Sequence, residues 1–249
     1  MSDTPQLYLT IDQGNSAAKM ALWRDDELMA LAIEEKLTAK AVSAFINGHG
    51  RVHAAMYCSV AEKGERIVAA VEGHCDKVMR LSSDTPVPIT IDYRTPATLG
   101  TDRVAAAVGA WAMCPGKNLL VVDAGTAVTY DAVSADGHFL GGNIAPGMRM
   151  RLDALHRFTA RLPQVEVPRE LTYDTFLGYD TPSAMILGAI YGIVGAISYY
   201  HSHLAPDTTV VMTGGWAREL SALCDFDVTV APDLVSTGLN RILLYNEDK

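Results

Sequence analysis

The sequence predicts an α/β protein made of two similar halves that face each other across a cleft. An apolar run at 119–122 ends in Asp123-Ala124-Gly125-Thr126 and then resumes with alternating side chains, which is typical of a buried strand, a tight turn and a second strand. The same pattern occurs at 7–11, followed by Asp12-Gln13-Gly14. Each copy continues into a hairpin turn and a third strand, and predicted helices and strands alternate after the first copy.

The two Asp-x-Gly turns indicate a ligand that carries phosphate. Glycine lets the backbone approach a ligand closely, and exposed amides attract anions. The carboxylates of Asp12 and Asp123 would repel phosphate alone, so a nucleotide with a metal ion is the natural interpretation. For either copy by itself, an ordinary β-turn with a solvated aspartate is the better explanation. Their recurrence favours the nucleotide.

Composition restricts the functional class. The chain has 249 residues and a formal net charge of −9, which argues against non-specific binding to nucleic acid or to an anionic membrane. The four cysteines are scattered without a Cys-x-x-Cys pair, which predicts reduced and buried thiols. Residues 1–6 lack a basic region followed by an apolar one, so we expect no signal peptide and a cytoplasmic protein.

The first half continues as alternating helices and strands. Thr38 precedes an apolar segment that Asn47-Gly48 ends, which predicts a capped helix through residue 46. Three further elements are expected: a strand at 52–58, a helix from the capping box Ser59-x-x-Glu62 to about residue 72, and a strand at 77–81.

Residues 93–103 form the most unusual stretch, Tyr-Arg-Thr-Pro-Ala-Thr-Leu-Gly-Thr-Asp-Arg, and an Ala-rich apolar segment follows at 104–113. We expect Thr101 to cap a helix here, which places Asp102 and Arg103 in the first turn. Taken alone, Asp102 is explained by its favourable interaction with the helix dipole. Pro115-Gly116 then breaks the chain, and we divide it there into domains of residues 1–115 and 116–249.

Residues 181–200 contain no charged side chain, which is a property of transmembrane helices. We predict a helix of a globular domain instead, because Thr181-Pro182 is a typical helix start and glycines recur within the segment. Gly188 and Gly192 form a stripe that permits close packing, either in the core or against a second copy of the chain.

The second half contains two more glycine-rich junctions. Gly141-Gly142 and Pro146-Gly147 flank an apolar spacer, which indicates close backbone packing against a ligand or a neighbouring strand. Thr213-Gly214-Gly215 follows a predicted strand, and such a junction either admits a nucleoside or forms a tight turn. The other expected elements are a helix at 148–158, a strand at 208–212, a helix from about residue 217 and a closing helix at 233–245.

Six motifs along the chain resemble those of the type III pantothenate kinase family. They are Asp12-Gln13-Gly14-Asn15-Ser16-Ala17-Ala18-Lys19; Tyr93-x-x-Pro96-x-x-Leu99-Gly100-x-Asp102-Arg103; Asp123-Ala124-Gly125-Thr126-Ala127; Gly141-Gly142 to Pro146-Gly147; Gly178-x-x-Thr181; and Thr213-Gly214-Gly215. The second motif is the specific one, whereas Asp-x-Gly alone indicates only the wider acetate and sugar kinase/Hsp70/actin superfamily. Ser16 stands where the family often has threonine, and it keeps the hydroxyl.

The resemblance implies two ribonuclease-H-like (actin-like ATPase) domains, each a mixed sheet flanked by helices, with a cleft between them. It implies a kinase that phosphorylates pantothenate with ATP and Mg²⁺ to give 4′-phosphopantothenate and ADP, the first step of coenzyme A biosynthesis. It also implies a monovalent cation, K⁺ or NH₄⁺.

The resemblance also assigns roles to particular residues. Asp102 would be the general base on the primary hydroxyl of pantothenate, Asp12 would lie near Mg²⁺, and Asp123 would bind the monovalent cation. The ATP phosphates would be held by Asp12, Gln13, Gly14, Asn15, Ser16, Ala17, Ala18, Lys19 and Thr126. Pantothenate would contact Tyr93, Gly100, Thr101, Asp102, Arg103 and Thr181, with its carboxylate paired to Arg103.

The uncharged segment 181–200 also bears on assembly. It has more apolar surface than a small domain is expected to bury alone, and isologous dimers are the commonest oligomers. Together with the resemblance this predicts a homodimer, in which Thr181 reaches the pantothenate pocket from the partner chain. A central core helix of one domain explains the same segment equally well.

Three other functions are compatible with parts of the sequence. Another small-molecule kinase of the superfamily would share the phosphate turns but not the 93–103 motif. A phosphohydrolase would use water as the nucleophile in place of a substrate hydroxyl. A non-catalytic ATP-binding regulator would not need Asp12, Asp102 and Asp123 together.

Overall fold

The computed structural model describes residues 6–59, 64–168 and 175–247. The chain forms two compact units. The first comprises residues 1–115, 137–139 and 233–249, and the second comprises residues 116–136 and 140–232. The predicted α/β class, with two mixed sheets flanked by helices, is confirmed.

The first unit contains a five-stranded mixed sheet in the order β3-β2-β1-β4-β5. Its strands are β1 (Leu7–Gln13), β2 (Ala18–Arg24), β3 (Glu27–Glu34), β4 (Val52–Ser59) and β5 (Cys75–Arg80). β1, β2 and β3 pair antiparallel, whereas β1, β4 and β5 pair parallel. Because β1 is central, Asp12 near its carboxyl end lies between the ends of β2 and β4.

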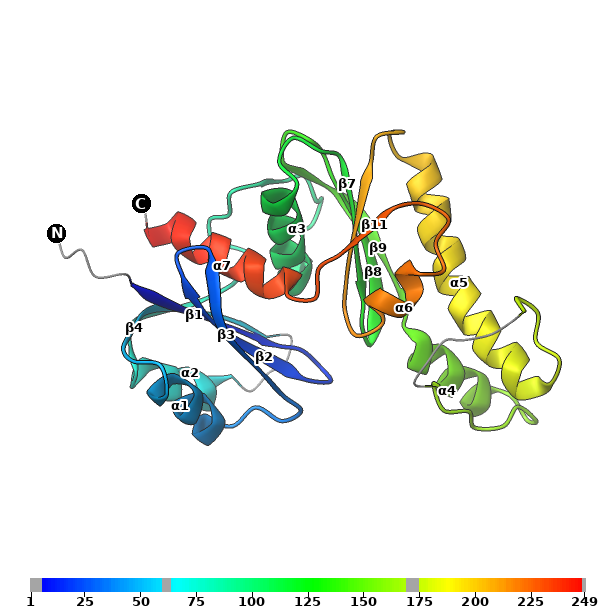
Figure 1. Cartoon of the computed structure of the whole chain (residues 1–249), viewed down its shortest axis with the longest axis horizontal. Helices are drawn as coiled ribbons and strands as arrows, with labels where there is room; N and C mark the ends of the chain where they lie inside the picture. The colour runs from blue at the N-terminus through cyan, green and yellow to red at the C-terminus, as the bar shows by residue number, and fades with distance from the viewer. Residues whose placement is uncertain (1–5, 60–63, 169–174, 248–249) are drawn as a thin grey trace. The chain divides into compact units, whose positions relative to one another are not determined.

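Helices cover both faces of this sheet (Figure 1). The elements are α1 (Ala39–Asn47) and α2 (Glu65–Glu72) on one face, and α3 (Thr101–Met113) and α7 (Leu234–Glu247) on the other. Val42 of α1 and Val71 of α2 are fully buried against Leu9 and Leu22 of the sheet. The amphipathic pattern that predicts these helices therefore marks the residues that build the core. A 3₁₀ turn (Pro96–Thr98) precedes α3.

Helix α7 packs closely against α3, and glycines make this possible. A Cβ on Gly238 would lie 1.8 Å from the carbonyl oxygen of Ala105, and a Cβ on Gly109 would lie 2.4 Å from that of Leu234. The far end of α7 is tied to the sheet, because the carboxylate of Glu247 accepts hydrogen bonds from Lys77 (2.6 Å) and His53 (2.9 Å). Residues 233–249 thus group with the first unit, whereas our sequence-based division assigned them to the second domain.

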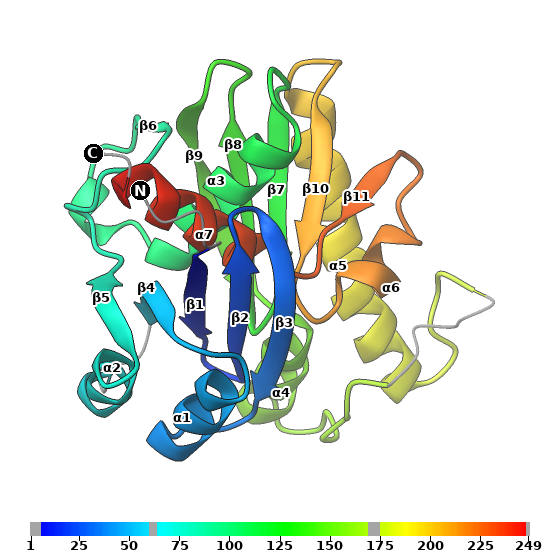
Figure 2. The same cartoon turned by 60° about the vertical axis from the view of Figure 1, so that its left-hand side comes forward.

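The second unit is built on the strands β7 (Leu119–Ala124), β8 (Ala127–Val133), β9 (His138–Pro146), β10 (Thr209–Thr213) and β11 (Val228–Val230). They are ordered β11-β10-β7-β8-β9, and the short strand β6 (Thr90–Ile91) follows β9 at the edge of this sheet. β7 and β8 pair antiparallel, and β7, β10 and β11 pair parallel. Figure 2 shows these strands side by side.

Three helices accompany this sheet: α4 (Met148–Phe158), α5 (Thr181–His203) and α6 (Ala217–Ser221). They share one core with β7, β8 and β10, in which Met148, Leu152 and Ile190 pack against Leu120 and Tyr130. Helix α5 begins at Thr181 with a proline in its first turn, as predicted, and Asp180 is its N-cap. The hydrogen bonds from Ser183 lower the pKa of the Asp180 carboxyl.

One face of α5 is buried in the core, and the other face is exposed and contains glycines. Nine of its residues are buried, whereas Gly188, Gly192 and Gly195 are exposed. Among the described residues it is the one helix long and apolar enough to cross a membrane, and half of its most apolar window is buried. The buried face is that of a core helix, which is one of the two alternatives that the sequence left open.

Several local predictions need correction. Helix α2 begins at Glu65 after Gly64, and Ser59 is the last residue of β4, so Ser59 caps no helix. The other half of that predicted capping box, Glu62, lies outside the described residues. Gly100, not Thr101, is the N-cap of α3. All four cysteines are free thiols, but only Cys58 is buried.

Candidate functional site

The first Asp-x-Gly turn connects β1 to β2. Gly14 donates its backbone N–H to the carbonyl of Ala17 (3.1 Å), which closes the turn. Asn15 and Ser16 at its tip are exposed, whereas Asp12 is half-buried. The turn therefore presents polar side chains to solvent at a glycine turn, the kind of backbone that binds phosphate.

The first cationic side chain after this turn is Lys19. Its ammonium group lies 3.7 Å from a carboxylate oxygen of Asp233, which immediately precedes α7. Both side chains are about 30% exposed (29% and 30%), so solvent screens the pair and it adds little to stability. The arrangement holds the lysine amine near the carboxyl end of β1, because Lys19 pairs with Asp12 in the β1–β2 ladder.

The start of α3 lies beside the same strand end. Cys58 is the β4 neighbour of Asp12, and its thiol is hydrogen-bonded to the hydroxyl of Thr101 (3.3 Å). Burial raises the pKa of the Cys58 thiol to about 12, and the nearby carboxylates of Asp12 and Asp102 raise this pKa as well. The sheet register places Asp12 next to Cys58, and the hydrogen bond of Thr101 places the start of α3 at the same thiol. Two motifs that are about 90 positions apart in the sequence are thus brought to one thiol.

The geometry of Asp102 explains the glycine that precedes it in the motif. Its carboxylate accepts the backbone N–H of Arg103 (2.9 Å). A Cβ on Gly100 would lie 2.5 Å from the same carboxylate oxygen, so a larger residue at this position would displace the Asp102 side chain. Asp102 is half-buried. It stands at the helix start expected from sequence, next to Thr101, whose hydroxyl is hydrogen-bonded to Cys58 of β4.

Arg103 is a buried cation, and only 5% of its surface is exposed. Its guanidinium carbon lies over the rings of Tyr93 and Phe139, 5.7 Å from each ring centre. A guanidinium over aromatic faces is attracted electrostatically. The structure therefore joins the predicted residues Tyr93 and Arg103 and adds Phe139, which the sequence analysis did not identify.

The second Asp-x-Gly turn connects β7 to β8 and is enclosed by two other loops. Gly125 donates its N–H to the carbonyl of Ala127 (3.0 Å). Gly147 donates to the carbonyl of Thr126 (3.0 Å), and Trp216 to that of Ala124 (3.2 Å). Thr126 itself is exposed at the tip.

Gly147 and Gly214 permit this enclosure. A Cβ on Gly147 would lie 2.4 Å from the carbonyl oxygens of Gly125 and Thr126. Gly214 has φ +94°, which favours glycine, and a Cβ there would lie 2.5 Å from the backbone of Ala124 and 2.6 Å from a carboxylate oxygen of Asp123. The two glycine-rich junctions singled out in the sequence thus pack against the second turn.

Thr181, the last predicted substrate residue, is the exposed first residue of α5. Gly178, in the same motif, lies against this first turn, because a Cβ on Gly178 would be 2.3 Å from backbone atoms of Ala184. This glycine lets the preceding loop approach the start of the helix.

The residues present fit the two predicted cations in different ways. In residues 6–59, 64–168 and 175–247 no group of three or more His, Cys, Asp or Glu side chains is arranged around a metal position. Mg²⁺ in kinases is held by one or two carboxylates together with substrate phosphates, so Asp12 fits without such a group. A monovalent cation needs oxygen ligands, and the absent side chain of Gly214 leaves room beside the carboxylate of Asp123.

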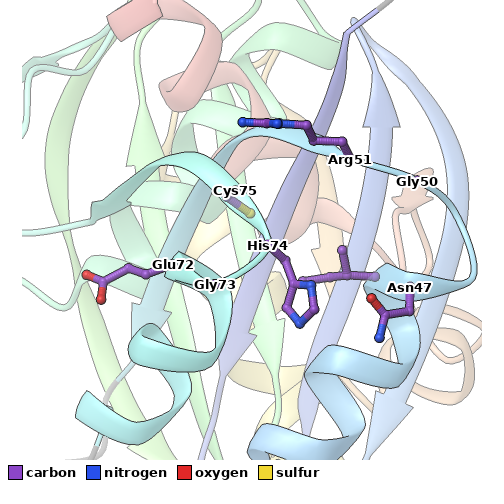
Figure 3. A pocket seen from close by; sticks show the side chains of 8 residues that line it. Asn47, Gly50, Arg51, Glu72, Gly73, His74 and Cys75 are labelled. Atoms are coloured by element: carbon purple, nitrogen blue, oxygen red, sulfur yellow. The ribbon is translucent and has the colours of Figure 1, made fainter.

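A separate hollow of about 460 Å³ lies in the first unit where α1 and α2 end (Figure 3). Asn47, Arg51, Glu72, His74 and Cys75 are among its lining residues. None of the residues predicted for the site lines it. Arg51 is also engaged by Asp76, its partner in a salt bridge. This hollow is therefore distinct from the candidate site.

Sequence reasoning missed three residues near the predicted ones: Cys58, Phe139 and Asp233. In the sequence, Cys58 and Phe139 look like ordinary apolar residues of strands, and Asp233 looks like an ordinary residue at the start of a helix. The only signal in the sequence was position, because Cys58 ends the strand predicted at 52–58 and Asp233 stands where the closing helix was predicted to begin.

Comparison with known proteins gives a consistent result. Residues 8–203 match the family described as type III pantothenate kinase. Type III pantothenate kinase from Porphyromonas gingivalis strain W83 is 39% identical over 241 residues, covering 96% of this chain and 98% of the relative. Those from Phocaeicola vulgatus and Bacteroides fragilis ATCC 25285 are 38% and 37% identical, covering 97% and 98% of this chain and 99% and 100% of their own lengths.

Solved structures support the fold. A protein from Campylobacter jejuni, proposed to be a Baf family transcriptional activator, aligns with TM-score 0.63 at 22% identity, covering 97% of this chain and all of that chain. A proposed 2-dehydro-3-deoxygalactonokinase from Sinorhizobium meliloti aligns with TM-score 0.59 at 14% identity, covering 96% of this chain and 99% of that chain. At these identities the likeness is evidence for the fold alone.

Proposed function

This chain belongs to the type III pantothenate kinase family, and from that premise we propose that it transfers the γ-phosphoryl group of ATP to pantothenate, giving 4′-phosphopantothenate and ADP. The observation that carries the proposal is the start of α3. There Asp102 follows Thr101, which is hydrogen-bonded to Cys58, the β4 neighbour of Asp12. The next residue, Arg103, is a buried cation that lies over two aromatic rings. A base and a carboxylate-binding cation next to a phosphate turn suit an acceptor that has both a hydroxyl and a carboxylate.

The proposed chemistry uses few groups. The primary hydroxyl oxygen of pantothenate forms a bond to the γ-phosphorus, the bond from that phosphorus to the β–γ bridging oxygen breaks, and Asp102 takes the hydroxyl proton. Such a transfer depends mostly on positioning and on electrostatic stabilisation of the phosphoryl oxygens. The amides and hydroxyls of residues 12–19 and Thr126 would bind the phosphates, and Lys19 would add a positive charge. Tyr93, residues 100–103 and Thr181 would contact pantothenate.

We propose that two cations accompany the nucleotide. Mg²⁺ near Asp12 would neutralise phosphate charge when ATP is bound, and a monovalent cation at Asp123 would offset the second carboxylate. Without such compensation, a carboxylate beside a polyanion in a desolvated site would be unfavourable.

We further propose that the chain acts in the cytoplasm as a homodimer, with coenzyme A biosynthesis as its pathway. The exposed glycine stripe of α5, at Gly188, Gly192 and Gly195, supports close approach of a second copy. Sedimentation of the wild type measures the assembly state. Gly188→Leu, at a position where a Cβ meets nothing within 4 Å in its own chain, is expected to weaken the dimer and pantothenate binding together. A wild type that is monomeric and fully active at assay concentration would contradict the shared pocket.

The direct test of the function is a coupled ADP-release assay with ATP, Mg²⁺ and K⁺. We expect ADP release that depends on pantothenate and not on a panel of sugars and other acids. Release with a sugar would indicate another kinase of the superfamily. Release without any acceptor would indicate a phosphohydrolase, and binding of ATP without release would indicate a regulator.

The role of Asp102 is tested by Asp102→Asn, which keeps the size of the side chain but cannot accept the proton. Loss of a general base typically lowers the rate by about 10²–10⁴-fold, so kcat should fall by that order. ATP affinity measured by calorimetry should stay near the wild-type value. A variant that keeps most of its kcat would leave Asp102 with a role at the helix start only.

A further inference from the structure

The side chain of Arg103 is held by a pair of aromatic rings rather than by one. Its guanidinium carbon lies 5.7 Å from the centre of the Tyr93 ring and 5.7 Å from that of Phe139. The two rings themselves are 6.1 Å apart and meet at 69°, edge to face. The guanidinium carbon and the two ring centres therefore form a nearly equilateral triangle. Two adjacent rings restrict the position of the guanidinium more than one ring would.

The position of Phe139 is set by a short backbone bridge. Residues 137–139 belong to the first unit, where β6 pairs in parallel with the start of β9, Ile91 opposite Phe139. The N–H of Asp92 donates to the carbonyl of Phe139 (3.0 Å), and the ring of His138 bonds to the carboxylate of Asp92 (2.8 Å).

The same bridge also sets Tyr93, which follows β6 by two residues. Phe139 is fully buried, so its ring is shielded from solvent. One two-residue strand pair therefore places both rings that contact Arg103.

We propose that Phe139 is a positioning residue that orients Arg103 for the carboxylate of the substrate and so contributes to selectivity for carboxylate-bearing acceptors. The proposal rests on the proposed function. An aromatic ring attracts the charge of a guanidinium, whereas a carboxylate accepts its coplanar N–H donors in bidentate fashion, so the two kinds of contact can act on the same side chain. A guanidinium that is already oriented loses less conformational freedom on binding, which favours the charged acceptor.

A buried phenylalanine also contributes to any core, so the test needs a readout that stability alone does not move. The ratio of kcat/KM for pantothenate to kcat/KM for its analogue with a hydroxymethyl group in place of the carboxylate is such a readout. A general loss of folded protein or of active-site order lowers both values and leaves the ratio unchanged. Loss of guanidinium orientation lowers kcat/KM for pantothenate but not for the analogue that lacks the carboxylate.

The experiment compares Phe139→Leu with Phe45→Leu in the full chain. Phe45 lies on α1 in the same unit, and its ring contacts His49, so the second variant makes the same change away from Arg103. For Phe139→Leu we expect the ratio to fall roughly tenfold through a higher KM for pantothenate, the order of a partly desolvated cation–π contact, with KM for ATP unchanged. Phe45→Leu should keep the wild-type ratio, and Phe139→Tyr, which retains the ring, should keep most of it.

Equal loss for both acceptors in Phe139→Leu would overturn the inference. If circular dichroism shows that this variant does not fold, Phe139→Met, which fills a similar volume without a ring, is read in the same way. A wild type that phosphorylates neither acceptor would contradict the proposed function itself, whereas an active wild type with an unchanged ratio in the variants would contradict only the role of Phe139.

Discussion

The turn at Asp12–Ala17 and the turn at Asp123–Ala127 share the Asp-x-Gly pattern, and in each the N–H of the glycine donates across the turn. Gly14 donates to the third residue after it, Ala17 (3.1 Å), whereas Gly125 donates to the second, Ala127 (3.0 Å). Their surroundings differ. At the first turn, a Cβ on Gly14 would meet only the carbonyl of Ala17, at 3.2 Å. The second turn receives hydrogen bonds from Gly147 and Trp216. Within the described residues of its own unit, the second turn is thus packed against two other loops, whereas the first has space beside its glycine.

This difference suggests separate tasks for the two turns. The exposed tip of the first turn, Asn15 and Ser16, can adjust around a phosphate group. The second turn is held by hydrogen bonds and close contacts from two neighbouring loops, so it can keep the Asp123 carboxylate in one place. A carboxylate that is already oriented before binding loses less conformational entropy when a cation binds, which favours binding.

The largest expected effect is at Gly214. In Gly214→Ala the Cβ would lie 2.5 Å from the backbone of Ala124, at φ +94°. Overpacking costs about 1–3 kcal/mol and a left-handed conformation about 1–2 kcal/mol, so the free energy of unfolding should fall by roughly 2–5 kcal/mol. Denaturant titration measures the loss. Gly215→Ala is the matched control, because a Cβ on Gly215 meets nothing within 4 Å, and a similar loss there would contradict the enclosure.

A second pair of variants compares the turns directly. Gly147→Ala places a Cβ 2.4 Å from two carbonyl oxygens, whereas Gly14→Ala places one at 3.2 Å from a single carbonyl oxygen. We expect the unfolding free energy to fall by about 1–3 kcal/mol in the first and by less than about 1 kcal/mol in the second. Equal losses would mean that the two turns are equally constrained.

The last prediction concerns the cations. If Asp123 holds a monovalent cation, replacing K⁺ by Na⁺ or Tris should lower kcat/KM about tenfold, which corresponds to about 1.4 kcal/mol. Asp123→Asn should remove this dependence on the salt, whereas Asp12→Asn should retain it and change the dependence on Mg²⁺ instead. Equal wild-type activity in the three salts would refute the assignment.

The comparison also shows which elements a sequence can predict. Helix α4 was predicted with its observed bounds, Met148–Phe158, and Thr38 caps α1 as expected, accepting the N–H of Ala41. Both depend on neighbours within a few positions. The Ser59 capping box failed because Ser59 continues in β4, paired with Gln13 of β1, and pairing in the sheet outweighed the local signal.

The candidate site divides in the same way. Residues 93–103 and the two Asp-x-Gly turns were identifiable because each is a contiguous motif with its own chemistry. Phe139 and Cys58 could not be identified in this way. The ring of Phe139 contacts Arg103, 36 positions earlier in the chain, and the thiol of Cys58 contacts Thr101, 43 positions later.

By itself the sequence determined the α/β class, most helices and strands, and the family to which the chain belongs, since these depend on local periodicity and short motifs. Only the tertiary structure decided that α7 returns to the first unit, that Phe139 joins Tyr93 at Arg103, and that Gly147 and Gly214 enclose one turn but not the other. The physical reason is that close packing between distant segments uses glycines and apolar residues, and these residue types also occur at many positions where no distant segment packs. The same glycine or phenylalanine therefore looks identical in the sequence whether or not a partner segment packs against it.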